Sequence, residues 1–194
     1  MARSPDSADE PKKKKKSKVD PFPRAVDTMF RLVASNHGQF SSMADGKANL
    51  LIQVNSIITT GSVSLLFARF GANPQLIIPG FLLVGVSVAS IVLAVLATRP
   101  NVTQGTFTRE DVALKRTNLL FFGNFHGASV EEYEWAVREM MKDPDYLYGS
   151  MTRDIYYTGL VLERKYRYLR WAYNVFMYGL VVAVIAFAIA VVAR

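Results

Sequence analysis

A face rich in arginine and aromatic side chains is expected on the helix that leads into the last apolar stretch of the chain. At helical spacing this face holds Arg153, Tyr157, Arg164, Tyr168 and Trp171. Guanidinium groups pair with phosphate, and aromatic rings stack on a base. The pattern predicts either a site for a phosphate and a base or a solvated basic face beside a membrane, whose long side chains snorkel to the water. In the first case the ligand would pull directly on a membrane helix.

A second set of candidate ligand residues precedes this helix. Arg116 is followed by the apolar run LLFFGNF, in which Phe121 and Phe122 are adjacent. Periodicity does not decide whether the run is a short strand or a buried loop. Its phenylalanines, Phe125 included, are expected in a core, and the alternative is a surface that stacks on a base. The candidate ligand-binding residues are therefore Arg116, Phe121, Phe122, Arg153, Tyr157 and Arg164.

Catalytic and metal chemistry have little support in the composition. The chain contains no cysteine and two histidines, His37 and His126, which are far apart in the sequence. This excludes a disulfide framework, a thiolate nucleophile and a Cys-ligated metal site, and it disfavours a zinc centre. The glycine-rich phosphate loops and the common hydrolase and metalloprotease motifs are also missing from the sequence. We expect no catalytic residue, no metal and no cofactor.

Three long apolar stretches are the elements that must position these residues. The 194-residue chain carries a net charge of +7, yet residues 48–70, 76–98 and 172–193 contain almost no charge. A helix needs about 20 apolar residues to cross a bilayer. The sequence therefore predicts an all-α membrane protein with three transmembrane helices. A small, mainly helical cytoplasmic segment, residues 99–171, is expected between the second and the third.

Signals for helix starts and helix contacts are also present. Ser129 and Glu132 form an S-x-x-E capping box that predicts a helix start. After the Asp-Pro pair at 143–144, a long helix is expected to run unbroken into the third span. Small residues four apart favour contacts between membrane helices, and two such pairs are Gly85 with Ala89 and Gly179 with Ala183.

The distribution of lysine and arginine predicts the orientation in the membrane. Residues 1–24 include a run of five lysines, so we expect a disordered basic tail that is attracted to anionic lipid rather than to nucleic acid. Residues 25–47 are expected to form an amphipathic cytoplasmic helix. The positive-inside rule places the N-terminus and residues 99–171 in the cytoplasm and the C-terminus in the periplasm. No signal peptide is expected, because the first apolar stretch begins far from the N-terminus.

A polar stripe continues from the amphipathic helix into the first apolar stretch. Its members share a helical face, because they follow i, i+4, i+8, i+11, i+15 spacing: Asp45, Asn49, Gln53, Ser56 and Thr60. Polar side chains at membrane depth need a partner or water. Two interpretations stay open, namely hydrogen bonding between helices and a pore-lining or gating stripe in a homo-oligomer.

Three stretches of the sequence form a specific combination. They are SNHGQFSSMADGKANLLIQVNSII, NLLFFGNF followed by SVEEYEWAV, and MTRDIYYTGLVLERKYRYLRWAYNVFMYGL. Together they resemble the Pycsar effector transmembrane family, PycTM, over about residues 27–180. The resemblance implies an effector of a bacterial antiphage system that senses cyclic UMP or cyclic CMP made by a partner uridylate or cytidylate cyclase. It further implies impairment of the inner membrane, which causes cell death and abortive infection.

Two other functions remain compatible with the residues. A structural or accessory membrane subunit that binds no small molecule fits three spans without a catalytic motif equally well. A small membrane enzyme, for example a hydrolase, would use Asp45, His37 and Lys47. His37, Ser41 and Asp45 share a helical face. We expect this second alternative to fail, so His37→Ala should leave toxicity intact. The expected partners are the lipid bilayer, the cyclic nucleotide and further copies of the chain.

Overall fold

Helices are the regular elements of the computed structural model, which describes residues 21–69, 74–100 and 105–192. Within these ranges no residue is assigned to a strand. Three of the helices are long and apolar enough to cross a membrane, which confirms the expected all-α membrane architecture. Most of the expected basic tail, residues 1–20, lies outside the described residues.

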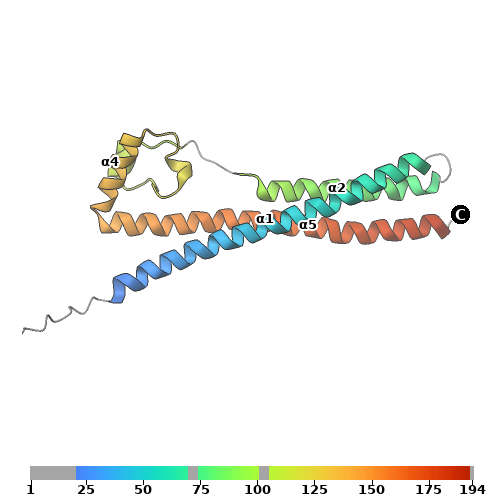
Figure 1. Ribbon diagram of the computed structural model, residues 1–194, viewed down its shortest axis with the longest axis horizontal. Helices are drawn as coiled ribbons and strands as arrows, with labels where there is room; N and C mark the ends of the chain where they lie inside the picture. The colour runs from blue at the N-terminus through green and yellow to red at the C-terminus, as the bar shows by residue number, and fades with distance from the viewer. Residues whose placement is uncertain (1–20, 70–73, 101–104, 193–194) are drawn as a thin grey trace, which may run out of the picture.

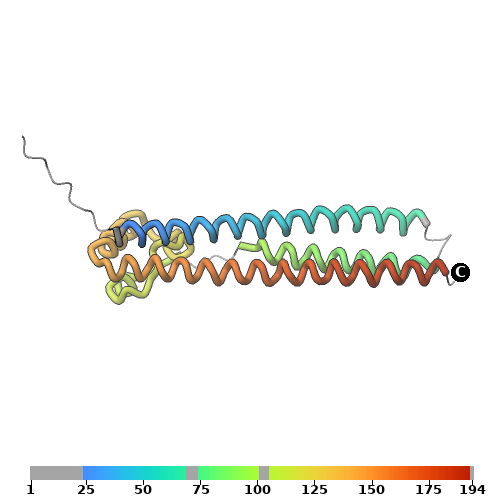
Figure 2. Tube along the Cα trace, turned by 90° about the horizontal axis from the view of Figure 1, so that it is seen from below, coloured from blue at the N-terminus to red at the C-terminus, as the bar shows by residue number. Residues whose placement is uncertain are grey.

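Three long helices run side by side along the molecule (Figures 1 and 2). They are α1 (Pro21–Arg69), α2 (Ile77–Thr98) and α5 (Pro144–Val192), and the short 3₁₀ helix η1 (Pro74–Leu76) precedes α2. Residues 25–47 and 48–69 belong to one continuous helix, α1. Helix α5 is likewise unbroken, as the sequence predicts. Helix α2 covers the half of the bundle that lies nearer the C-terminus (Figure 1).

Small side chains form the core of this bundle. Small residues allow helix backbones to approach closely. The resulting van der Waals contacts are a main source of packing energy between helices in lipid. A Cβ added at Gly179 of α5 would lie 2.3 Å from a methyl group of Val86 on α2, whereas a Cβ at Gly85 would meet nothing within 4 Å. Of the two predicted small-residue pairs, only the one on α5 therefore lies at a helix contact. The buried core residues are Ala44, Ala48, Leu51, Ala94, Ala97, Leu169 and Ala172.

A polar network joins the three long helices inside the bundle. The side-chain amide of Asn55 donates to the Leu51 carbonyl at 2.9 Å and to Ser90 Oγ at 3.4 Å. Ser90 Oγ in turn donates to the carbonyl of Ala172 at 3.1 Å. Asn55 and Ser90 are both fully buried. The amide N–H groups of Asn55 are thus paired within the chain, whereas Asn55 Oδ1 and Thr59 Oγ1 are buried without a hydrogen-bond partner among the described residues.

The α3–α4 segment, residues 105–143, folds at the end of the bundle opposite the C-terminus (Figure 1). It contains α3 (Arg109–Ala113), the 3₁₀ helix η2 (Phe122–Asn124) and α4 (Val130–Met141). The run LLFFGNF forms turns and η2 rather than a strand. The start of α1 lies at the same end of the molecule. The segment encloses a second small core made of Val112, Leu119, Ala136, Met140 and Tyr146.

Ion pairing replaces one half of the predicted capping box. Ser129 Oγ accepts from the Glu132 backbone N–H at 3.3 Å, but the Glu132 carboxylate pairs with Arg109 at 2.8 Å instead of reaching back. The hydrogen bond from Arg109 lowers the pKa of Glu132. The Arg109 guanidinium also lies 4.8 Å from the centre of the Trp135 ring. A complete capping box that the sequence reading missed joins Thr108 and Asp111 at the start of α3. These contacts fasten α3 to α4.

Candidate functional site

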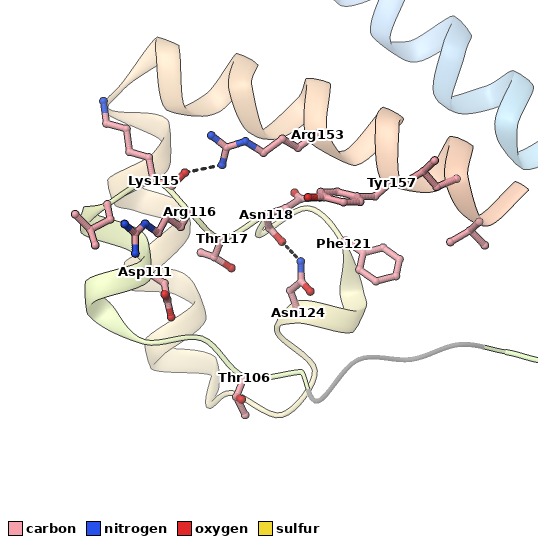
Figure 3. A pocket seen from close by; sticks show the side chains of 13 residues that line it. Thr106, Asp111, Lys115, Arg116, Thr117, Asn118, Phe121, Asn124, Arg153 and Tyr157 are labelled. Atoms are coloured by element: carbon pink, nitrogen blue, oxygen red, sulfur yellow. Dashed lines mark hydrogen bonds between the residues drawn. The ribbon is translucent and has the colours of Figure 1, made fainter. Parts of the chain in front are cut away.

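An open cavity of about 740 Å³ lies between the α3–α4 segment and helix α5. We name it the loop–α5 cavity; Figure 3 shows its lining side chains converging from the loops and from the helix. Its volume falls in the range of cavities that hold small ligands. The lining residues are Thr106, Asp111, Leu114, Lys115, Arg116, Thr117, Asn118, Phe121, Asn124, Arg153, Tyr157, Leu160 and Val161.

Two of the cavity's cations are engaged by the protein itself. Arg153 Nη1 donates to the Lys115 carbonyl at 2.5 Å (Figure 3). Lys115 has a φ of 55°, in the left-handed region that most residues avoid, so its backbone is held in a costly conformation. The Lys115 ammonium forms an ion pair with Asp143, and this hydrogen bond lowers the pKa of that carboxyl. These contacts fix the loop after α3 against the start of α5.

Arg116 is the cavity cation whose side chain makes no hydrogen bond or ion pair within the described chain. Its side chain is exposed. The nearby Asp111 carboxylate accepts from Thr108 Oγ1 at 2.6 Å and from the Thr108 N–H at 2.9 Å. The Thr108 side-chain hydrogen bond is the main reason that the pKa of Asp111 is lowered, and the positive charge of Arg116 contributes to the same shift. Arg116 is therefore available to pair with an external anion.

Two aromatic rings stand at the other end of the cavity from Lys115 and Arg116 (Figure 3). Tyr157, on α5, is 55% exposed, and its ring packs edge-on against Tyr156 with centroids 5.5 Å apart. Phe121, at the start of η2, is half-buried. Open ring faces of this kind stack on planar ligands. The cavity thus combines a basic end with an aromatic end.

Asparagine side chains hold the floor of the cavity in place. Asn118 is 4% exposed; its amide donates to Asp154 Oδ1 at 3.1 Å, and its Oδ1 accepts from the Leu120 N–H at 3.0 Å. Asn124 Nδ2 donates to the Asn118 carbonyl at 2.8 Å (Figure 3). Because Asp154 belongs to α5, the floor is fastened to the same helix that carries Tyr157. A movement of the loop must therefore act on α5.

Four of the six predicted ligand residues line this cavity: Arg116, Phe121, Arg153 and Tyr157. Phe122 lies outside it and is 54% exposed, whereas a place in the core was expected. Arg164 also lies outside, with its guanidinium 5.8 Å from the centre of the Tyr168 ring. Phe125 packs on Tyr133, with ring centroids 4.2 Å apart. The sequence analysis did not include Lys115, Thr117 and Asn118, the neighbours of Arg116, among the ligand residues; their position just before the apolar run was the available signal.

The family model of the Pycsar effector protein domain, PycTM, matches residues 28–192 of the chain. The chain belongs to the PycTM family. The matched range contains all the residues of the cavity and most of the three long helices. This membership identifies a membrane protein that is a Pycsar effector in antiphage defence. Comparisons with curated proteins and with solved structures found no match.

The predicted polar stripe of this PycTM chain divides into two parts. Both carboxylate oxygens of Asp45 accept from Lys165 Nζ on α5 at 2.9 Å. The other members are exposed on the surface of α1 and do not contribute to the polar network inside the bundle: Asn49, Gln53, Ser56 and Thr60.

The residues of the enzyme alternative are also placed by the PycTM fold. Ser41 Oγ accepts from Lys165 Nζ at 2.9 Å, so Ser41 and Asp45 share one ammonium group. No hydrogen bond joins His37 to either of them in the part of the chain that the structure describes. Within the same residues, no group of three or more His, Asp or Glu side chains is arranged to hold a metal ion.

Proposed function

We propose that the loop–α5 cavity binds a cyclic pyrimidine mononucleotide, cyclic UMP or cyclic CMP, which a partner uridylate or cytidylate cyclase produces. Binding then makes the protein impair the bacterial inner membrane and causes abortive infection. One observation carries the proposal: the unpaired cation Arg116 and the exposed ring of Tyr157 face the same cavity. Tyr157 belongs to a helix that continues into the membrane.

The two ends of the cavity match the two parts of such a ligand. A cyclic phosphodiester carries a single negative charge, which suits Arg116 together with the N–H groups of the Arg153 guanidinium that are not used in its bond to Lys115. A pyrimidine ring is flat and suits the faces of Tyr157 and Phe121. Threonine hydroxyls at 106 and 117 offer donors and acceptors to the edge of the base.

The path from the cavity to the membrane is a single helix. Arg153 and Tyr157 lie on α5, which runs without a break to Val192. A ligand shifts a conformational equilibrium by its differential affinity for the two states. Nucleotide that binds better to one position of α5 relative to the loop therefore changes the population of membrane-helix arrangements. No catalytic group is needed for this mode of action.

The proposed orientation follows from where the ligand is made. The α3–α4 segment and the start of α1 lie at one end of the molecule, and the C-terminus lies at the other (Figure 1). A cyclase product is cytoplasmic, so the cavity and the N-terminus face the cytoplasm and the C-terminus faces the periplasm. The exposed Trp171 and the basic residues before it then lie at the cytoplasmic interface of the inner membrane.

Direct binding tests the proposal. We expect the purified chain in nanodiscs to bind cyclic UMP or cyclic CMP and to bind cyclic AMP and cyclic GMP more weakly. Arg116→Ala should weaken binding about 10- to 150-fold, because a hydrogen bond to a charged group is worth about 1.5–3 kcal/mol. The matched control is Arg164→Ala, an arginine on α5 outside the cavity, which should bind like the unaltered chain.

Two results would contradict the proposal. A folded sample that binds none of the four nucleotides would favour the accessory-subunit function. An equal loss of affinity in Arg116→Ala and Arg164→Ala would remove the cavity as the site. Membrane impairment is tested separately by nucleotide-dependent release of dye from liposomes that contain the protein, and unchanged release at saturating nucleotide would contradict it.

A further inference from the structure

One face of α1 points away from α2 and α5 and carries small and polar residues at heptad spacing. The positions follow alternating steps of four and three residues, and every one of them is exposed: Ser42, Gly46, Asn49, Gln53, Ser56 and Thr60. We name this face the α1 seam. These steps average 3.5 residues, which is the spacing of contact positions in two helices that supercoil around each other.

The α1 seam continues well into the apolar part of the bundle. Asn55 of α1 hydrogen-bonds to Ser90 of α2, which precedes Thr98, the end of that helix, by eight residues. At a rise of about 1.5 Å per residue, this level lies about 12 Å along α2 from its end. Gln53 precedes Asn55 by two residues and is therefore closer to the level at which α2 ends. Its amide lies roughly 9 Å from that level, inside the apolar part of the bundle.

Lipid offers no hydrogen bonds to the exposed polar side chains of the seam that lie between the levels of the two ends of α2. Unpaired polar groups in hydrocarbon are costly, and polar residues there generally face a neighbouring helix or water. On the inner face of α1 the amide N–H groups of Asn55 follow this rule, because they are paired with Leu51 and Ser90. Asn49 and Gln53 lie outside that network and are exposed. The surface that covers them must therefore be polar and must lie in the membrane.

A second copy of the chain is the partner that matches the seam. Copies in one membrane share the same orientation, so two seams meet in parallel and each residue faces its own counterpart. An amide group both donates and accepts, which makes Asn49 complementary to Asn49 and Gln53 complementary to Gln53. A Cβ added at Gly46 would meet nothing within 4 Å, so this position leaves open space for a neighbouring backbone.

We propose that two copies of this chain pack in parallel through their α1 seams. The inference deepens the proposed function, on which it rests for insertion in the membrane, but it requires no nucleotide. The seam is then a helix contact between chains, with its polar groups paired in the resting state.

Cysteine cross-linking in native membranes tests the seam, and the chain is suited to it because it contains no cysteine. Gln53→Cys and Ser56→Cys should each form a disulfide-linked dimer with copper phenanthroline in the absence of nucleotide. The matched control is Val54→Cys. Val54 is 37% exposed and lies at the depth of Gln53, but about 100° around the helix. It should give little or no dimer.

A second variant reports on the energy of the contact. The double variant Asn49→Leu, Gln53→Leu removes both amides and leaves an apolar surface that lipid can cover. It should weaken association about ten-fold. Energy transfer between labelled copies in dilute liposomes measures this association. Equal cross-linking at positions 53 and 54, absence of dimer at both seam positions, or unchanged association of the double variant would overturn the seam. Nucleotide binding in the same samples separates the two proposals: binding without seam dimers overturns the seam alone, and seam dimers without binding overturn the nucleotide site alone.

Discussion

Arg116 and Arg153 both place a guanidinium group at the loop–α5 cavity, but their surroundings differ. Arg153 already donates to the Lys115 carbonyl, so it positions the loop as well as facing the cavity. Arg116 makes no such bond among the described residues. A charged donor that makes no hydrogen bond can bind an anion without breaking one. Replacement of Arg116 is therefore a sharper test of the site than replacement of Arg153.

The Lys115–Asp143 pair predicts a pH-dependent stability at the residue scale. The hydrogen bond from Lys115 is the main cause that holds the pKa of Asp143 below its ordinary value of 3.8. A carboxyl with a lowered pKa stabilises the folded state above its ordinary pKa, and this contribution disappears as the pH falls through the folded value. We expect Asp143→Asn to lower the melting temperature at pH 7 and to have a smaller effect as the pH falls below 3.8.

Thermal unfolding in detergent at pH 7 and pH 3 measures this difference. Asp145→Asn, at a carboxyl that makes no ion pair among the described residues, is the control and should have little effect at either pH. A destabilisation by Asp143→Asn that is equal at pH 7 and pH 3 would show that the ion pair is not its cause.

Residue types pointed to part of the cavity but not to its outline. Guanidinium and aromatic groups suit a phosphate and a base, which points to Arg116, Phe121, Arg153 and Tyr157. Arg164 shares a helical face with Arg153, but the α3–α4 segment does not reach that far along α5. Asn118 lines the floor because of the path of a loop stabilised by hydrogen bonds distant in sequence. Periodicity carries no information about such a path.

At the scale of helices, the contact between α2 and α5 depends on the absence of a side chain at Gly179. A Cβ there would meet Cγ1 of Val86 at 2.3 Å, and valine is too stiff to turn away easily. We expect Gly179→Ala to destabilise the bundle by about 1–3 kcal/mol through overpacking. Gly85→Ala, at a position with nothing within 4 Å, should be neutral or stabilising by up to about 1 kcal/mol.

Unfolding of both variants in mixed micelles provides the comparison. Equal stability of Gly179→Ala and Gly85→Ala would mean that the two helices do not approach each other at Gly179 as closely as described.

Length and hydropathy were sufficient to predict the three membrane helices. An apolar stretch of more than about 20 residues has few alternatives to a spanning helix. Length and hydropathy were not sufficient to show that residues 25–47 and 48–69 form one helix. A change from charged to apolar composition does not end a helix, so composition alone does not locate its ends. The Ser129–Glu132 capping box formed only in part because Arg109, distant in sequence, attracts the Glu132 carboxylate.

At the scale of the whole molecule, Lys165 joins the two longest helices near the membrane boundary. Its ammonium binds Asp45 and Ser41 of α1. We expect Lys165→Asp to increase nucleotide-independent membrane leak, because two carboxylates would repel each other across the α1–α5 contact. If the pair is worth about 1 kcal/mol to the resting state, the leak should rise roughly five-fold.

The exchanged pair, Asp45→Lys with Lys165→Asp, should restore low leak because it restores attraction. Dye entry into cells that lack the partner cyclase measures both variants. Equal leak in the single and the exchanged variant would show that the ion pair does not hold the resting state.

The unbroken α5 helix has a consequence for how such proteins can be recombined. With 49 residues and a rise of about 1.5 Å each, it is a rod about 73 Å long that belongs to both the cavity and the membrane bundle. One residue inserted between Tyr157 and Lys165 turns one half against the other by about 100°, whereas seven residues nearly restore the original angle. A chimaera that joins the cavity half of one relative to the membrane half of another must therefore conserve helical phase. The position at which two relatives can be joined is therefore determined by the helical repeat of α5 and not by a flexible linker.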